Sequence, residues 1–245
     1  MIGLKKYSKK VGYLPLKESY TRDELLIPDF LLAKESDIEI YYCTHNEYIN
    51  KEAKVFIIGI TPGFQQMNKS IAVARKCLEE NLSFDESAYI CKREARFFGI
   101  IRRNIIQMLD DLDLNRVLHL GSSEELFSDK DFLLHTTSLI PYAVFINGKN
   151  YTGHSPKILK NELLTLFLET YFKPQAAQLQ NALIIPLGKG VEEVLSRYIR
   201  EGVIKEENIL LGFPHPSGAN GHRLQQFSMN KERMKETIRA FFRKG

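Results

Sequence analysis

The chain has 245 residues, 44% of them hydrophobic and 26% charged, which is the composition of a folded globular protein and argues against a disordered one. The formal net charge of +4 is compatible with a polyanionic partner but too small to establish one. The cysteine count of 3, without a C-x-x-C pair, argues against a disulfide framework and against a four-cysteine metal or iron–sulfur site. We therefore expect neither a metal nor a cofactor.

The N-terminus carries lysines but no apolar segment long enough for a signal peptide or a membrane span, so we expect a cytoplasmic protein. Pro15 and Pro28 limit any long helix near the start, where residues 38–42 offer one short strand. We expect residues 1–50 to be an irregular extension packed on the core. Residues 51–245 are expected to form one domain.

The next elements alternate between strand and helix. Residues 55–58 are a continuous apolar run that ends in a glycine, which is typical of a parallel strand buried on both faces. Helical segments follow, with apolar positions on one face of a helix at 101–112. Residues 117–120 are compatible with a strand or a helix, whereas residues 132–137 predict a strand that stops before Pro141.

The last part of the chain continues this alternation. After a long loop at 142–154, we expect a helix from Pro156 to about Phe172. A buried strand at 182–185 precedes another helix, and a last strand at 208–211 precedes an amphipathic C-terminal helix. Strands separated by helices imply right-handed crossovers and a parallel sheet with helices on both faces.

The strand at 55–58 ends in the loop Gly59-Ile60-Thr61-Pro62-Gly63. Its glycines permit tight turns and the close approach of a ligand to backbone N–H groups, and its proline stiffens the loop. No Gly-Lys-Ser/Thr follows, so the loop is not a phosphate-binding loop of the Walker type. Taken alone, this pattern indicates no more than a turn.

The last strand leads into a second loop, which reads His215-Pro216-Ser217-Gly218-Ala219-Asn220-Gly221. A histidine between two prolines has little backbone freedom, so its ring is presented in a nearly fixed direction. Because ligands bind outside the carboxyl ends of the strands of a parallel sheet, we expect both loops at the same edge. Together the two loops predict a functional site, although a turn with an incidental histidine explains the second loop equally well by itself.

These motifs resemble those of the uracil-DNA glycosylase superfamily, in which Gly-x-x-Pro-Gly follows the first sheet strand and His-Pro-Ser follows the last. The resemblance extends to Leu187-Gly188-Lys189 and Arg96-Phe97-Phe98-Gly99, and it covers roughly residues 55–224. It is strongest to bacterial glycosylase-like proteins that share Gly-Ile-Thr-Pro-Gly and His-Pro-Ser-Gly-Ala-Asn. It implies a three-layer α/β/α sandwich around a mainly parallel four-stranded sheet, with DNA as the partner and no metal or iron–sulfur cluster. The implied activity is removal of uracil or another deaminated base in base excision repair.

The resemblance also implies roles for individual residues. His215 would donate a hydrogen bond to the base oxygen, and Phe98, or alternatively Phe97, would stack on the base. The other base-binding positions would be Gly59, Ile60, Pro62, Gly63 and Ser138. The DNA would be contacted by Ser217, Gly218, Asn220 and Arg223, with Leu224 as a wedge that enters the duplex.

Two residues depart from the pattern of the family. Thr61 stands where other members carry Asp or Asn, and a threonine hydroxyl orients water but cannot act as a general base near neutral pH. Ser138 stands where related proteins carry an Asn whose amide reads the edge of the pyrimidine, and a single hydroxyl cannot make that paired contact. We therefore expect slow catalysis, and the identity of the base stays open.

Several interpretations stay open at this point. The intact His215 motif favours a DNA glycosylase, whereas Thr61 and Ser138 favour a module of the same fold that binds DNA or a nucleotide without cleaving it. A small-molecule hydrolase is disfavoured because the chain has no Gly-x-Ser-x-Gly elbow and no carboxylate near the motifs. The aromatics and amides of the loop at 142–154 suit contact with an unstacked strand, or alternatively a hairpin with surface tyrosines.

Overall fold

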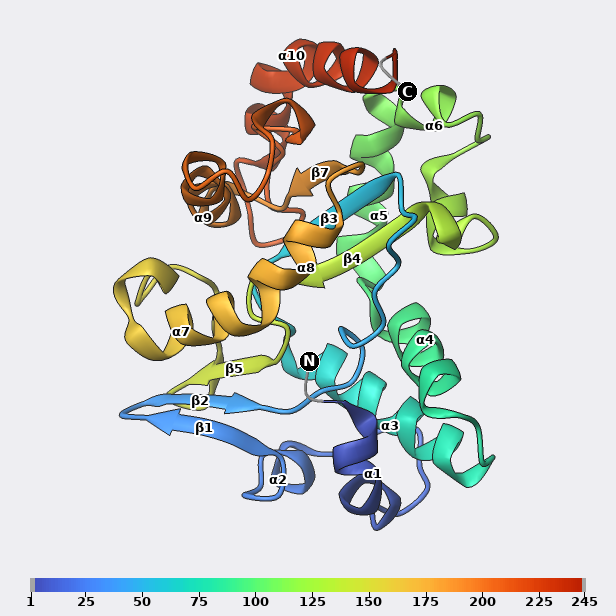
Figure 1. The fold of residues 1–245 in the computed structure, drawn as a ribbon, viewed down its shortest axis with the longest axis vertical. Helices are drawn as coiled ribbons and strands as arrows, with labels where there is room; N and C mark the ends of the chain where they lie inside the picture. The colour runs from blue at the N-terminus through green and yellow to red at the C-terminus, as the bar shows by residue number, and fades with distance from the viewer. Residues whose placement is uncertain (1–2, 244–245) are drawn as a thin grey trace. The chain divides into compact units, whose positions relative to one another are not determined.

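A computed structural model describes residues 3–243 of the chain (Figure 1). These residues form two compact units, and the chain passes between them repeatedly. The first unit consists of residues 3–49, 61–96 and 138–172, and the second of residues 50–60, 97–137 and 173–243. The first fifty residues thus group with two later segments. The expected division into an extension and one domain at residue 50 stays a prediction.

The second unit contains the predicted parallel sheet, except for Ser138 at the end of one strand, which groups with the first unit. Its strands lie in the order β4 (Leu134–Ser138), β3 (Val55–Gly59) and β7 (Leu183–Pro186), and β3 pairs with β7 in parallel, from Val55 opposite Leu183 to Ile58 opposite Pro186. The fourth expected strand, at 208–211, is reduced to a single parallel bridge between Ile184 and Ile209. It is short because a 3₁₀ turn ends at Asn208 and Gly212, with a φ of 91°, follows.

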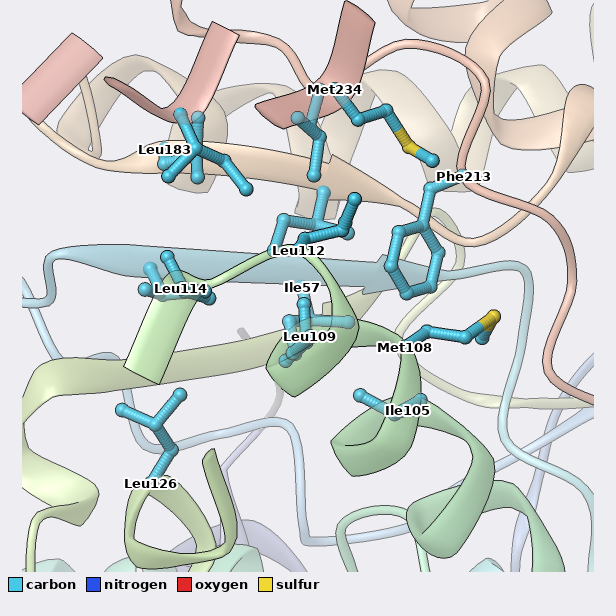
Figure 2. Packing of buried hydrophobic residues seen from close by; sticks show 14 of the residues in the cluster. Ile57, Ile105, Met108, Leu109, Leu112, Leu114, Leu126, Leu183, Phe213 and Met234 are labelled. Atoms are coloured by element: carbon cyan, nitrogen blue, oxygen red, sulfur yellow. The ribbon is translucent and has the colours of Figure 1, made fainter. Parts of the chain in front are cut away.

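Helices cover both faces of this sheet, so the structure is the α/β sandwich that the sequence predicts. In Figure 1, α8 crosses in front of β3 and β4, and α5 lies behind them. Figure 2 shows how Ile57 of β3 and Leu183 of β7 pack with Leu109 of α5 and Met234 of α10 in an apolar core. The helices of this unit are α5 (Gly99–Asp111), α6 (Leu114–Val117), α8 (Lys173–Gln178), α9 (Lys189–Arg200) and α10 (Arg223–Arg243), with short 3₁₀ turns at Ser123–Phe127, Asp131–Leu133 and Glu206–Asn208. Residues 117–120, compatible with strand or helix from their sequence, form the end of α6 and a turn.

The first unit is built on an antiparallel sheet with the strand order β1-β2-β5-β6. Its strands are β1 (Leu31–Glu35), β2 (Ile38–Tyr41), β5 (Ala143–Ile146) and β6 (Lys149–Asn150). Its helices are α1 (Leu4–Gly12), α2 (Arg22–Leu25), α3 (Phe64–Glu79), α4 (Phe84–Ala95) and α7 (Glu162–Phe167), with a 3₁₀ turn at Ile158–Lys160 and a π-helical turn at Leu168–Phe172.

The expectation that the N-terminal segment is irregular apart from one short strand is wrong. Leu4, Tyr7 and Val11 recur at helical spacing and are buried on one face of α1. The ring of Tyr7 stacks on that of Tyr42, with 3.8 Å between the ring centroids. The helices are short, as expected from Pro15 and Pro28, because α1 ends before Pro15 and α2 ends before Pro28.

Two further expectations in the first unit need correction. The helix expected from Pro156 begins at Glu162, because the side chain of Asn161 accepts a hydrogen bond from Leu164 N–H at 2.9 Å and caps the helix. The loop expected at 142–154 contains the hairpin β5–β6, and its aromatic side chains Tyr142, Phe145 and Tyr151 are buried. These rings are therefore neither surface tyrosines nor a stacking platform for nucleic acid.

Candidate functional site

The His215 loop begins at the carboxyl edge of the sheet in the second unit. Leu187 N–H donates to Ile58 O at 2.9 Å, and Gly188 N–H donates to Phe213 O at 3.0 Å. These bonds hold the ends of β3 and β7 beside the segment that leads to His215. Phe213 itself is anchored in the apolar core (Figure 2). Gly59 and His215 therefore lie at the same edge of the sheet.

Gly188 is the position against which the histidine packs. A Cβ built on Gly188 would lie 3.0 Å from Cβ of His215, and its φ of 88° lies in the left-handed region. Both facts favour glycine, because a side chain would strain the backbone at this φ and would crowd His215. The Leu187-Gly188-Lys189 motif thus has a physical reason, which is to let the histidine loop approach the start of α9.

The histidine ring has a defined hydrogen-bond partner within its own loop. Ser217 N–H donates to Nδ1 of His215 at 3.3 Å. A neutral imidazole carries one proton, and a ring whose Nδ1 accepts a hydrogen bond carries that proton on Nε2. The half-buried His215 side chain therefore presents an N–H donor at Nε2.

Side chains from two helices and from the loop itself fix its backbone. The buried Asn104 of α5 donates from Nδ2 to Pro216 O at 2.7 Å, and Arg223 at the start of α10 donates to Ser217 O at 3.3 Å. Asn220 donates from Nδ2 to His215 O at 3.1 Å. Asn104 is absent from the sequence-predicted residues. Its signal in the sequence is an amide between Ile101 and Ile105 on the otherwise apolar face of the helix.

Exposed apolar side chains lie beside this loop and at the starts of α5 and α10 in the second unit. Phe98, which directly precedes α5, is 39% exposed, whereas Phe97 packs partly against the core. A Cβ on Gly218 would lie 3.9 Å from Ile100, which is also exposed. Leu224 is 70% exposed at the start of α10. Of the two phenylalanines considered for base stacking, Phe98 is thus the accessible one.

The rest of the glycine-proline loop belongs to the first unit and leads into α3. Gly63 N–H donates to Oε1 of Gln66 at 3.4 Å, and Gln66 in turn donates to Ala95 O at 3.2 Å. Phe64 N–H donates to Oδ1 of Asn150 at 3.0 Å. The first N–H groups of the helix are therefore satisfied by amide side chains. Gln66 is not among the sequence-predicted residues, and Asn150 was considered only as one of the amides of the loop at 142–154, because the contacts of both depend on the tertiary fold.

The other predicted residues of the first unit are Thr61, Pro62 and Ser138. Thr61 is half-buried, Pro62 is buried, and Ser138 is buried at the end of β4. Within residues 3–243, the hydroxyls of Thr61 and Ser138 make no hydrogen bond. The predicted residues thus fall into two groups. Gly59, Ile60, Phe98 and the His215 loop lie in the second unit, and Thr61, Pro62, Gly63 and Ser138 lie in the first.

The interior of the first unit also contains groups with strongly shifted pKa values. Burial, followed by the charge of Lys92, lowers the pKa of His45 to about 3, so this ring is neutral near pH 7. Burial, followed by the charge of Arg96, lowers the pKa of Lys92 well below its ordinary value. Lys92 Nζ lies 3.3 Å from Oδ1 of Asn46, and Asn46 donates to Pro141 O at 3.1 Å. These contacts give buried polar groups hydrogen-bond partners.

The described part of the chain contains neither a candidate metal cluster nor a membrane-spanning helix. Its histidine, cysteine, aspartate and glutamate side chains form no group of three or more that could hold a metal ion. Cys43, Cys77 and Cys91 are free thiols and all are buried. Over residues 3–243, no helix combines the length and the apolar character needed to cross a membrane.

Comparison with known proteins defines the family. The model of the uracil DNA glycosylase superfamily matches residues 47–242, so the chain belongs to this superfamily. The chain is 42% identical over 239 residues to a protein of Bacillus subtilis (strain 168) described as "Uncharacterized protein YoxB", and this similarity spans 97% of the present chain and 93% of that protein. No solved structure matches the chain.

Proposed function

We propose that this protein is a DNA glycosylase that hydrolyses the N-glycosidic bond of uracil or another deaminated base, in base excision repair in the cytoplasm. The observation that carries the proposal is the hydrogen bond from Ser217 N–H to Nδ1 of His215, at 3.3 Å. This bond assigns the proton of a neutral ring to Nε2, which is the atom that donates to the base oxygen in the proposed reaction. Membership of the superfamily supports the same reaction.

The proposed reaction needs a donor for the departing base. A glycosylase holds a flipped or single-stranded base in a pocket, and positive charge builds on the sugar as the bond breaks. Negative charge builds on the base, and the Nε2–H of His215 stabilises it. A fixed donor of this kind contributes about 100- to 1000-fold to the rate. Backbone N–H groups of the loop that begins at Gly59 act beside it, and Phe98 stacks on the base.

Water and DNA are handled by other side chains in this proposal. Thr61 orients the attacking water, with no general base at this position, so the reaction is slow. Ser217 Oγ accepts from Ala219 N–H at 3.1 Å, which leaves its own O–H free to donate to a phosphate. Arg223 and the backbone of Gly218 also contact phosphate, and Leu224 acts as the wedge. Asn220 supports the site mainly by holding the carbonyl of His215.

The test is a cleavage assay on single- and double-stranded oligonucleotides that carry uracil, hypoxanthine, xanthine or a G·T mismatch. Alkali converts abasic sites to strand breaks. We expect breaks on at least one substrate, with a rate about 100- to 1000-fold lower in His215→Ala. His222→Ala is the matched control, because His222 is an exposed histidine near the end of the same loop and should leave the rate within about twofold.

One observation favours a second function, which is DNA binding without cleavage. Thr61 provides no general base for the attacking water. If high concentrations of the protein produce no breaks on any substrate and still retard DNA in a gel, the enzyme proposal fails and the binding module replaces it. If His215→Ala and His222→Ala cleave as fast as the unmodified protein, the reaction does not depend on His215.

A further inference from the structure

A side-chain amide lies at the glycine-proline loop in the first unit. Asn150 of β6 accepts the hydrogen bond of Phe64 N–H with Oδ1 at 3.0 Å. Its Nδ2 lies 3.5 Å from the point that a Cβ on Gly63 would occupy. Gly63 has no side chain, and the amide of a residue far along the chain thus lies beside the space that such a side chain would take.

The orientation of this amide is fixed by its surroundings. Only the oxygen of Asn150 can accept from Phe64 N–H, so the nitrogen is necessarily on the side of Gly63. Asn150 pairs with Phe145 across the hairpin. The guanidinium of Arg22 lies 4.9 Å from the ring centroid of Phe64 and 4.9 Å from that of Phe145, and it donates to Gly148 O. The hairpin and the start of α3 are therefore held together.

The Nδ2 group of Asn150 makes no hydrogen bond with residues 3–243. Asn150 is exposed, so its two N–H donors are available to a ligand. Ser138, at the position where related proteins carry an amide, has one hydroxyl that donates or accepts equally well and cannot distinguish a carbonyl from an amine.

We propose that Asn150 selects the base by donating from Nδ2 to its exocyclic carbonyl. This inference rests on the proposed function, because it assumes that the loop at Gly63 binds a base. Deamination replaces an exocyclic amine, which donates hydrogen bonds, with a carbonyl, which accepts them. A fixed donor therefore favours a deaminated base over its parent, in pyrimidines and purines alike. Asn150 is thereby a specificity-determining residue that supplies the amide missing at Ser138.

The variant Asn150→Asp separates base selection from structure. Aspartate keeps an oxygen that accepts from Phe64 N–H, and its negative charge is favourable at the start of a helix, so the melting temperature should not fall. It replaces the donor with an acceptor. We expect the preference for a uracil over a cytosine oligonucleotide, measured as the ratio of the two affinities, to fall about tenfold. The ratio cancels the general repulsion between the added charge and DNA.

Asn161→Asp is the matched control. Asn161 also caps a helix of the first unit, by accepting from Leu164 N–H at 2.9 Å. The substitution Asn161→Asp makes the same change of charge and chemistry away from Gly63, so the affinity ratio should stay as in the unmodified protein. An equal fall in both variants, or no fall in Asn150→Asp, would overturn the inference.

A second readout does not require catalysis. The side-chain amide resonance of Asn150, identified by its loss in Asn150→Asp, is followed by NMR while an oligonucleotide is added. The probe contains 2′-fluoro-2′-deoxyuridine, whose fluorine destabilises the positive charge on the sugar and so prevents cleavage. We expect the resonance to shift with this probe and not with its cytosine counterpart. A selective shift in a protein that cleaves nothing would refute the glycosylase and keep the inference. Cleavage of uracil without a selective shift would keep the glycosylase and refute the inference.

Discussion

The His215 loop and the glycine-proline loop at Gly63, here called the Gly63 loop, obtain their functional groups in different ways. The His215 loop carries its own donor, and its surroundings hold the backbone through Gly188, Asn104 and Arg223. The Gly63 loop has small side chains, and its functional amide comes from Asn150, which is 86 positions from Phe64. The first arrangement demands an accurate backbone, whereas the second demands an accurate tertiary contact. Substitutions in the two regions should therefore fail in different ways.

Gly188→Ala should have the largest effect. The new Cβ would lie 3.0 Å from Cβ of His215 in a backbone with a φ of 88°. We expect a loss in kcat of more than about tenfold and less than about 100-fold, because 100-fold is the effect of a full 1 Å displacement of a reacting group and this contact displaces His215 by less. Gly202→Ala is the matched control, because Gly202 has a φ of 70° and no atom within 4 Å of the built Cβ. It should lose about 1 kcal/mol of stability without losing kcat. Equal kcat losses in both variants would show that strain alone, and not contact with His215, is responsible.

Asn104→Leu should have an intermediate effect. It removes the donor to Pro216 O, at 2.7 Å, and leaves a buried carbonyl unsatisfied. The cost is about 1–3 kcal/mol of stability, and we expect kcat to fall about tenfold with KM nearly unchanged. Asn208→Leu removes a similar hydrogen bond, from Nδ2 to Gln180 O at 2.6 Å, at the opposite end of the segment that leads to His215. It should destabilise the protein without changing kcat. If kcat falls equally in both variants, Asn104 has no particular role in positioning the histidine.

Glu47→Gln should have the smallest effect on kcat, and its effect should appear as a change in the pH dependence of stability. Burial raises the pKa of Glu47 to about 7, although hydrogen bonds from Tyr42 and Leu4 oppose the shift. The folded state therefore binds the proton more tightly than the unfolded state. This contribution to stability is complete below pH 4.5 and is lost as the pH rises through about 7.

The measurement is the free energy of unfolding in urea between pH 5 and pH 8. Relative to Glu47→Gln, the unmodified protein should lose up to about 1.4 kcal/mol per pH unit within that window. His45 acts in the opposite direction, because its pKa of about 3 makes stability fall as the pH is lowered. Both proteins contain His45, so the difference between them isolates Glu47. Parallel curves for the two proteins would contradict the prediction.

Local sequence signals predicted two strands of the second unit and their loops, although the fourth expected strand, at 208–211, is only a single bridge. The apolar runs at β3 and β7 predict buried strands, and glycine or proline at their ends predicts the loops, because backbone conformation is set by neighbouring residues. The same signals missed the strand β1 and the helix α1. Their apolar residues are sparse, and packing such as that of Tyr7 on Tyr42 stabilises the helix more than its own composition does.

The candidate site could be predicted only in part for the same reason. His215 and Gly59 lie in motifs of contiguous residues, whereas Asn104 and Asn150 reach the loops from distant elements. An asparagine on a helix or a hairpin has several common roles, and its sequence neighbours do not show which carbonyl or N–H group it will meet. The roles of Asn104 and Asn150 therefore needed a three-dimensional description.

The interleaving of the two units has a consequence for how the gene can change. The chain moves between the units after residues 49, 60, 96, 137 and 172, so no single break point divides the sequence into one piece for each. Recombination that exchanged residues 1–50 with a relative would replace β2 while keeping its partner β5. It would replace Glu47 together with the helix α1, whose Leu4 N–H donates to Glu47. Neither unit is encoded by one contiguous segment that could be exchanged as a whole. We expect the two units to have been transmitted together, with selectivity altered by point substitutions rather than by shuffling.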